Sequence, residues 1–160
     1  MVKIGIISDT HLDRATDDFK SAIKTIFSDV DMIIHAGDMI GMGIYEYLSN
    51  WELKAVRGNM DNHDLQAILP NKRIEEIDGK KIGIMHGKGP PYFTEAFVFN
   101  EFYGVDVIIF GHSHMPCHVK RGNVVMFNPG SFRKPYTPPG TAGIMEISNN
   151  EIMFKLLEVK

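Results

Sequence analysis

Two histidines stand two positions apart in the segment Gly111-His112-Ser113-His114, directly after the apolar residues 107–110. A neutral imidazole nitrogen is a common transition-metal ligand, so the pair could hold a metal ion. One pair alone is weak evidence, because single histidines at strand ends usually have structural roles. The interpretation therefore depends on whether other ligand-type residues occupy equivalent places in the chain.

Similar side chains follow the other buried strands that we expect. Five apolar runs each end in a carboxylate, an amide or an imidazole, and three of these groups come directly after a glycine. The residues are Asp9 and His11, Asp38, Asn59, His86, and His112 with His114. The carboxyl ends of strands line the ligand crevice of α/β sheets. Each residue has a structural alternative, such as a helix N-cap for Asp9, but seven such groups at one rim would repel or remain unsatisfied without cations.

The ligand types limit which cations fit. Three carboxylate or amide groups and four imidazoles, with no thiolate, suit Mn, Fe, Zn, Ni or Co and are too rich in nitrogen for Ca or a lone Mg. Seven ligands exceed the four of a structural zinc site, but they fit two metals that share one carboxylate. Two metals about 3.5–4 Å apart can hold a bridging hydroxide and support an in-line phosphoryl displacement. The histidine pair would then give one imidazole to each metal.

Hydrophobic periodicity indicates the elements that position this rim. Short apolar runs predict buried strands at residues 2–7, 32–35, 53–56 and 107–110. Helical spacing predicts one helix over residues 19–27, N-capped by Thr16, and another around 44–48. This order, β-α-β-α-β, implies parallel strands covered by helices.

The second half of the chain is dominated by turn signals. They predict three hairpins, which pair residues 73–77 with 81–85, 117–120 with 124–127, and 144–147 with 152–156. The Pro- and Gly-rich residues 135–140 are expected to form one loop. A βαβ half followed by hairpins predicts an α/β fold in which two mixed sheets stack face to face with helices outside.

Composition restricts the class of protein. The 160 residues are 44% hydrophobic and 23% charged, which is typical of one globular domain. The net charge of −3 disfavours long nucleic acid as a partner. The single cysteine, Cys117, excludes an internal disulfide, and we expect an inert, half-buried thiol there. No signal peptide and no apolar stretch near ~20 residues is evident, so we expect a cytoplasmic protein without a membrane partner.

The motifs D-x-H, GD, GNxD, H and GHxH, in this order over residues 9–114, resemble those of the calcineurin-like metallophosphoesterase superfamily. The chain length and the NPGS segment at residues 128–131 resemble its small single-domain phosphodiesterase branch. The resemblance implies a four-layer α/β/β/α sandwich of two mixed β-sheets flanked by helices, with residues 1–160 as a single metallophosphoesterase domain. By motif position, the first metal would be held by Asp9, His11, Asp38 and His114. The second would be held by Asp38 as the bridge, Asn59, His86 and His112.

We therefore expect a metal-dependent phosphoric ester hydrolase, a phosphodiesterase rather than a monoesterase, that acts on a small phosphodiester. Its cofactors would be two divalent transition-metal ions, Mn or Ni in first place and Fe, Zn or Co as alternatives. The expected catalytic residues are Asp38, Asn59 and His86, and the expected substrate contacts are Asn59 and Arg57. Two alternatives stay open: a non-catalytic protein-interaction scaffold, since a retromer subunit shares this fold, and a nuclease. A homo-oligomer is also left open.

One position departs from the superfamily pattern. Many members have a histidine directly after the GN asparagine, where it assists the leaving group or binds the phosphate, whereas this chain has Met60. A methionine can neither donate a proton nor carry a charge. Asp61 and His63 lie close by, and the sequence does not indicate whether either compensates for Met60.

Other chemistry-bearing residues have simpler explanations. We expect His35, inside a strand, to be a core or supporting residue and His118, on a hairpin strand, to lie at the surface. The aromatic residues 92–103 fit an amphipathic helix that serves mostly for core packing. An apolar wall for the substrate and a dimer patch are the alternatives for this segment.

Overall fold

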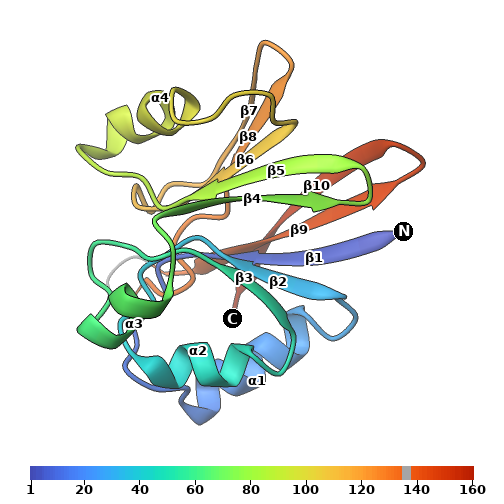
Figure 1. The fold of residues 1–160 in the computed structure, drawn as a ribbon. Coiled ribbons are helices and arrows are strands. Elements are labelled where there is room, and N and C mark those ends of the chain that lie inside the picture. The colour runs from blue at the N-terminus through green and yellow to red at the C-terminus, as the bar shows by residue number, and fades with distance from the viewer. Residues whose placement is uncertain (135–137) are drawn as a thin grey trace.

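Residues 1–134 and 138–160, which this computed structural model describes, form two five-stranded mixed sheets (Figure 1). The first sheet has the order β10-β9-β1-β2-β3. Its strands are β1 (Val2–Ile7), β2 (Met32–His35), β3 (Glu52–Ala55), β9 (Gly140–Ser148) and β10 (Glu151–Val159). The second sheet has the order β4-β5-β6-β8-β7. Its strands are β4 (Lys72–Ile77), β5 (Lys80–Met85), β6 (Val107–Phe110), β7 (Cys117–Arg121) and β8 (Val124–Asn128).

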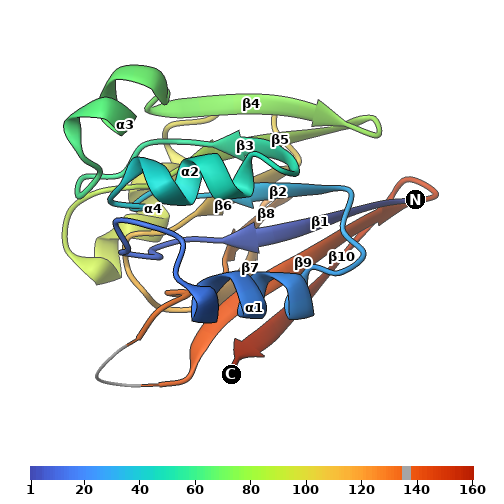
Figure 2. The same ribbon diagram turned by 90° about the horizontal axis from the view of Figure 1, so that it is seen from below.

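Helices cover the outer faces of the two sheets. The first sheet is covered by α1 (Asp17–Ile26) and α2 (Met42–Leu48), which lie across β1, β2 and β3 in Figure 2. The second sheet carries α4 (Thr94–Phe99), which directly follows the 3₁₀ turn η1 (Pro91–Phe93). A short helix, α3 (His63–Ile68), lies between β3 and β4 in the chain. The predicted α/β fold with four layers, α/β/β/α, is confirmed.

Alternating side chains of the central strands build the layers. In β1, Ile4 and Ile6 are fully buried against the second sheet, together with Ile84 and Ile109. Ile7 points to the other face and packs with the helices. Burial on both faces explains why these strands are continuous apolar runs rather than alternating ones. The main core therefore lies between the two sheets.

Parallel pairing brings the strand ends together. Ile7 pairs with His35 across β1 and β2, and His35 pairs with Ala55 across β2 and β3. In the second sheet Met85 pairs with Phe110 across β5 and β6. The loops after these five strands consequently emerge at one edge of each sheet, as expected from the rule that ligand crevices lie at carboxyl ends.

The elements differ from the predictions in two places. The helix α3 was not predicted, because its six residues bury only Leu65 and give no measurable periodicity. It is fixed locally by Asn62, whose side chain accepts a hydrogen bond from the Leu65 N–H at 3.0 Å. The helix predicted over residues 92–103 is shorter, since α4 ends at Phe99.

The three hairpins are confirmed as β4–β5, β7–β8 and β9–β10. Part of the loop predicted over residues 135–140, namely residues 135–137, lies outside the described residues. Within the described part of the chain, no helix has the length and apolar character that crossing a membrane requires.

Candidate metal centre

Asp9 follows β1, and its side chain is completely buried. One carboxylate oxygen, Oδ1, has no hydrogen-bond partner within the described residues. The imidazole nitrogens around it are the Nε2 atoms of His114 at 3.2 Å, His11 at 3.7 Å and His86 at 3.8 Å. A buried carboxylate oxygen without a hydrogen bond is costly, and it is an arrangement that a cation relieves.

Asp38 stands between two of these histidines. Its Oδ2 lies 3.2 Å from His11 Nε2 and 3.3 Å from His86 Nε2, while its Oδ1 accepts the Met60 backbone N–H at 2.8 Å. Burial alone would raise the pKa of the Asp38 carboxyl, but hydrogen bonds from His11 and His86 outweigh it and hold the pKa well below its usual range. Asp38 is therefore an ionised carboxylate that contacts imidazoles on two sides.

The four histidines of the rim form two pairs. The rings of His11 and His114 have centroids 5.1 Å apart, and those of His86 and His112 lie 5.2 Å apart. Asp38 contacts one member of each pair. The arrangement therefore offers two neighbouring sets of nitrogen ligands with a shared carboxylate between them.

Asn59 completes the second set. Its Oδ1 lies 3.1 Å from His86 Nε2 and 3.2 Å from His112 Nδ1. The opposite ring nitrogens donate to backbone carbonyls, His86 Nδ1 to Ala36 at 2.7 Å and His112 Nε2 to Gly89 at 2.9 Å. A carbonyl can only accept, so these hydrogen bonds place a proton on the outer nitrogens and direct His86 Nε2 and His112 Nδ1 toward Asn59.

The carboxylates attract positive charge strongly. Burial lowers the pKa of His86, yet the hydrogen bond to Asp38 and the charges of Asp9 and Asp38 raise it above its ordinary value overall. The Asp9 carboxylate, whose Oδ1 lies 3.2 Å from His114 Nε2, likewise raises the pKa of His114. Burial alone would raise the pKa of the Asp9 carboxyl, but His114 and His86 outweigh this effect and lower the pKa overall. A divalent cation would displace the imidazole protons and take over this electrostatic role.

Backbone strain concentrates at the same residues. Asp9, His11, Asp38, His112 and His114 have φ angles of 55°, 49°, 63°, 68° and 60°. This left-handed region is uncommon for residues other than glycine and costs free energy. Such strain clusters at functional sites, where the surrounding structure enforces it. The turns at Asp9 and His11 bring both side chains to one set of ligands, whereas the turns at His112 and His114 direct one imidazole to each histidine pair.

Two of the glycines that precede the rim residues are required by close approach. A side chain at Gly58 would collide with Asp38 Oδ1, and one at Gly111 would collide with Ser8 Oγ. At both positions only glycine lets the backbone approach these neighbouring atoms so closely.

The structure brings all seven predicted ligand residues to one rim. Ligand atoms of Asp9, His11 and His114 lie within 4.8 Å of one another, as do those of Asp9, Asp38 and His86. Asn59 and His112 join the second set through the contacts described above. Asp9 takes a more central place than the motif order suggested, since its Oδ1 faces histidines of both pairs.

Asp61 has a role that the sequence did not indicate. Its carboxylate is 7% exposed and accepts three backbone N–H groups, from Gly58 at 2.7 Å, Ile40 at 2.9 Å and Asp38 at 3.3 Å. It thus ties the loop after β2 to the loop after β3. Its place in the GNxD motif, two residues after Asn59, was the signal in the sequence, and that position left open whether Asp61 compensates for Met60.

Three further expectations can be compared with the structure. His35 is buried in the core, where burial lowers its pKa to about 3, so its ring is neutral. Its Nδ1 accepts the Gly37 N–H at 3.1 Å, which leaves Nε2–H to face Thr10 Oγ1 at 3.2 Å. His118 is exposed, and Cys117 is half-buried. All three positions agree with the predictions.

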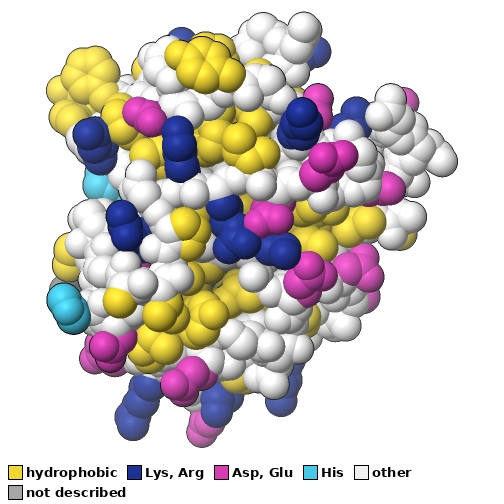
Figure 3. Space-filling model, viewed as in Figure 1, with side chains coloured by type: hydrophobic (Ala, Val, Ile, Leu, Met, Phe, Trp, Pro, Cys, Tyr) yellow, Lys and Arg dark blue, Asp and Glu magenta, His cyan; other side chains and the backbone are white. Residues whose placement is uncertain are grey.

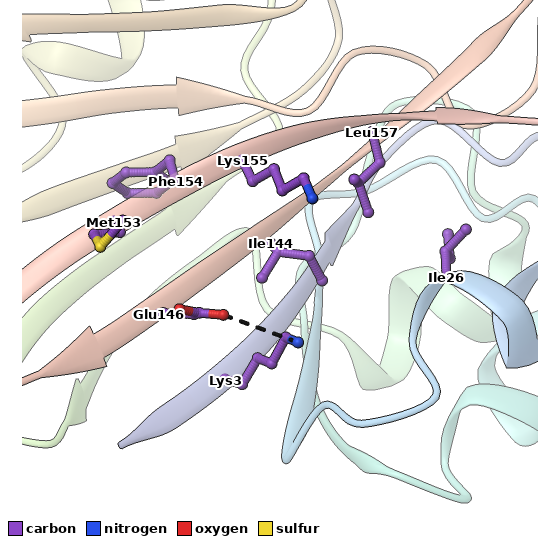
Figure 4. Close-up of a pocket in the computed structure, with 8 residues that line it drawn as sticks. All are labelled: Lys3, Ile26, Ile144, Glu146, Met153, Phe154, Lys155 and Leu157. Carbon is purple, nitrogen blue, oxygen red and sulfur yellow. Dashed lines mark ion pairs between the residues drawn. The ribbon is translucent and has the colours of Figure 1, made fainter.

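Two pockets flank different parts of the sandwich. One, of about 330 Å³, includes Asn59, His86 and Arg57 in its lining and so adjoins the rim. The other, of about 270 Å³, lies on β1, β9 and β10 beside α1. Figure 4 shows its lining of apolar side chains with Lys3 and Glu146, whose charged groups are 3.9 Å apart. Lys3 is near the start of β1, at the opposite end of the strand from Asp9, so this second pocket is remote from the histidines.

The fold and the rim together define an α/β/β/α protein with a candidate metal centre. The calcineurin-like phosphoesterase superfamily domain matches this chain over residues 2–150. The chain therefore belongs to the calcineurin-like metallophosphoesterases, as the sequence motifs predicted.

Individual relatives agree with this assignment. Probable metallophosphoesterase MJ0623 of Methanocaldococcus jannaschii is 35% identical over 98% of this chain and 81% of its own length. Phosphodiesterase MJ0936 of the same organism is 29% identical over 98% of this chain and 100% of its own length. The crystal structure of Chaetomium thermophilum Vps29 superposes with a TM-score of 0.80, covering 100% of this chain and 87% of that chain, at 21% identity. This last likeness concerns the fold alone.

Proposed function

We propose that this chain is a phosphodiesterase that depends on two divalent metal ions. The observation that carries the proposal is the buried pair of ionised carboxylates, Asp9 and Asp38, which face imidazoles from two sides while Asp9 Oδ1 has no hydrogen bond within the described residues. A cluster of this composition fits Mn or Ni, with Fe, Zn or Co as alternatives.

Each metal would have four ligands from the rim. One ion would be held by Asp9, His11, Asp38 and His114, and the other by Asp38, Asn59, His86 and His112. The bound ions would supply a bridging hydroxide at neutral pH and neutralise charge on the phosphoryl oxygens. We also take residues 1–160 as a single metallophosphoesterase domain and a cytoplasmic location as parts of this proposal.

The remaining chemistry belongs to the side chains around the rim. The carbonyls of Ala36 and Gly89 hold two imidazoles in the tautomers that a metal needs. Asn59 directs its Oδ1 to the histidines, so its amide N–H groups are available to a phosphoryl oxygen. Asp38 and the rim histidines would hold the ions, and the ions would supply the positive charge that a phosphoryl group needs.

A phosphodiester with a good leaving group fits this site better than a phosphate ester whose leaving oxygen needs a proton. Met60 offers no proton, and the Asp61 carboxylate is fully used by three backbone N–H groups. His63 is exposed in the first turn of α3. The relative named Phosphodiesterase MJ0936 supports the same choice of substrate class.

The test combines metal removal with two substitutions. Protein treated with a chelator should lose hydrolysis of bis(4-nitrophenyl) phosphate and regain it with Mn or Ni. Asp38→Asn should abolish turnover and reduce metal content, because a neutral amide replaces the carboxylate shared by two cations. His118 is an exposed histidine on β7, and His118→Ala is the control that should keep both turnover and metal content.

Three outcomes would overturn the proposal. Activity that survives metal removal, verified by elemental analysis, would exclude metal-dependent hydrolysis. Metal binding without turnover of phosphodiesters, phosphomonoesters or single-stranded oligonucleotides would favour the non-catalytic scaffold, and cleavage of oligonucleotides alone would favour the nuclease.

A further inference from the structure

The pocket beside the rim has its own walls, apart from the candidate metal ligands. It lies between α3 and α4, with Gln66 from α3 and Phe97 from α4 on facing sides. Its volume of about 330 Å³ exceeds what a single phosphate group needs. Because Asn59 and His86 also line it, whatever fills it would lie next to a phosphoryl group at the rim.

Arg57 is one of two cations in this pocket, and it is held in place. Its Nη1 donates to the backbone carbonyl of Gln66 at 3.2 Å. The Gln66 side chain in turn donates to the carbonyl of Gly58 at 2.8 Å. No carboxylate forms an ion pair with Arg57 in the described part of the chain. The half-buried guanidinium therefore keeps N–H donors and an uncompensated charge for a ligand.

Lys88 is the second cation. Its Nζ lies 4.8 Å from the centre of the Phe97 ring, and it also has no ion-pair partner among residues 1–134 and 138–160. The acidic residue of the lining, Glu101, lies 3.6 Å from Lys72 Nζ and is compensated by that contact. In a chain of net charge −3, this pocket thus carries a local excess of positive charge.

The surface view shows the same feature. Figure 3 shows Lys and Arg side chains on the surface between the regions of α4 and α3, where the pocket lies. An anionic arm of a substrate would be attracted to the two cations of the pocket, Arg57 and Lys88.

From this arrangement we infer that the pocket binds a second phosphate group, carried by one arm of the phosphodiester substrate. The inference rests on the proposed function, and it narrows the substrate class to phosphodiesters that bear an additional phosphomonoester. A guanidinium and an ammonium on one pocket suit a dianionic phosphate, because the planar fork of arginine matches two phosphate oxygens. The excess volume accommodates the sugar or alkyl unit that joins the two phosphates.

A matched pair of substrates tests the inference in the Mn-loaded protein. Thymidine 5′-(4-nitrophenyl phosphate) and its 3′-phosphorylated derivative share the leaving group and the scissile bond, and they differ only in the second phosphate. We expect kcat/KM for the 3′-phosphorylated substrate to be about tenfold higher, and the ratio to fall as salt is added. Arg57→Gln and Lys88→Gln should each bring the ratio of the two kcat/KM values toward unity.

Lys120→Gln is the control for loss of one positive charge, since Lys120 is exposed on β7 and does not line the pocket. It should keep the wild-type ratio. A wild-type ratio of one, or an unchanged ratio in both pocket variants, would overturn the inference while the proposed function stands.

A binding measurement separates this inference from the proposed function. If the Mn-loaded protein hydrolyses neither substrate, titration calorimetry compares thymidine 3′,5′-bisphosphate with thymidine 5′-monophosphate. About tenfold tighter binding of the bisphosphate, lost in Arg57→Gln, would support the pocket even if the proposed activity fails. Equal binding of the two ligands would refute it.

Discussion

Replacement of Asp61 by asparagine tests whether this carboxylate fixes the two loops that carry Asp38 and Asn59. In the structure it accepts hydrogen bonds from three backbone N–H groups. An asparagine side chain can place its oxygen toward Gly58 and Asp38 or toward Ile40, but not both. Its NH₂ group then faces at least one N–H donor, which is left without an acceptor.

The expected loss in free energy of unfolding follows from the number of hydrogen bonds that the asparagine cannot make. A buried donor left unsatisfied costs about 1–3 kcal/mol, and the remaining hydrogen bonds weaken because they lose a charged acceptor. We therefore expect Asp61→Asn to lower the free energy of unfolding by about 2–4 kcal/mol. This is a large part of the ~5–15 kcal/mol that is typical of a domain. The affinity for Mn should fall about 10–100-fold, because the Asp38 backbone N–H is one of the three donors.

Urea unfolding and Mn titration provide the assay. Asp64→Asn makes the same chemical change three positions later, at an exposed site in the first turn of α3. It should stay within about 0.5 kcal/mol of the wild type in free energy of unfolding. If the unfolding midpoints and Mn affinities of the two variants coincide, Asp61 does not anchor the loops and the interpretation of its hydrogen bonds is wrong.

Two further predictions concern Met60 and Cys117. Met60 is 58% exposed beside Asn59 and supplies no proton, so log kcat/KM of the wild type should fall steeply with leaving-group pKa. Met60→His should make this dependence on leaving-group pKa shallower, because a histidine could donate a proton and accelerate the slow substrates up to ~10²–10⁴-fold. If kcat/KM of the wild type does not depend on leaving-group pKa, another group already donates the proton. For Cys117, burial and the neighbouring Glu95 raise the thiol pKa to about 11. Alkylation by iodoacetamide at pH 8 should be about a hundredfold slower than for a free cysteine and should accelerate as pH rises toward 11, because the thiolate reacts. Glu95→Gln should accelerate the alkylation at pH 8. If Cys117 of the wild type reacts as fast as free cysteine, its pKa is not raised.

The sequence alone was sufficient to place the seven rim residues together. Asp9, Asp38, Asn59, His86 and His112 each follow an apolar run, and parallel strands necessarily direct their carboxyl ends to the same edge. The hairpins were equally predictable, since turn chemistry and strand periodicity are local properties. Short-range patterns thus determined the elements and the composition of the candidate site.

Only the tertiary structure decided what supports that site. The Asp61 anchor joins segments more than 20 positions apart, and the contact between Arg57 and the Gln66 carbonyl depends on α3, which has too few residues for a periodic signal. The placement of β6 beside both β5 and β8 likewise depends on long-range pairing. Hydrogen bonds and charges of this kind form between residues that the fold brings together, so their partners have no spacing in the sequence from which they could be predicted.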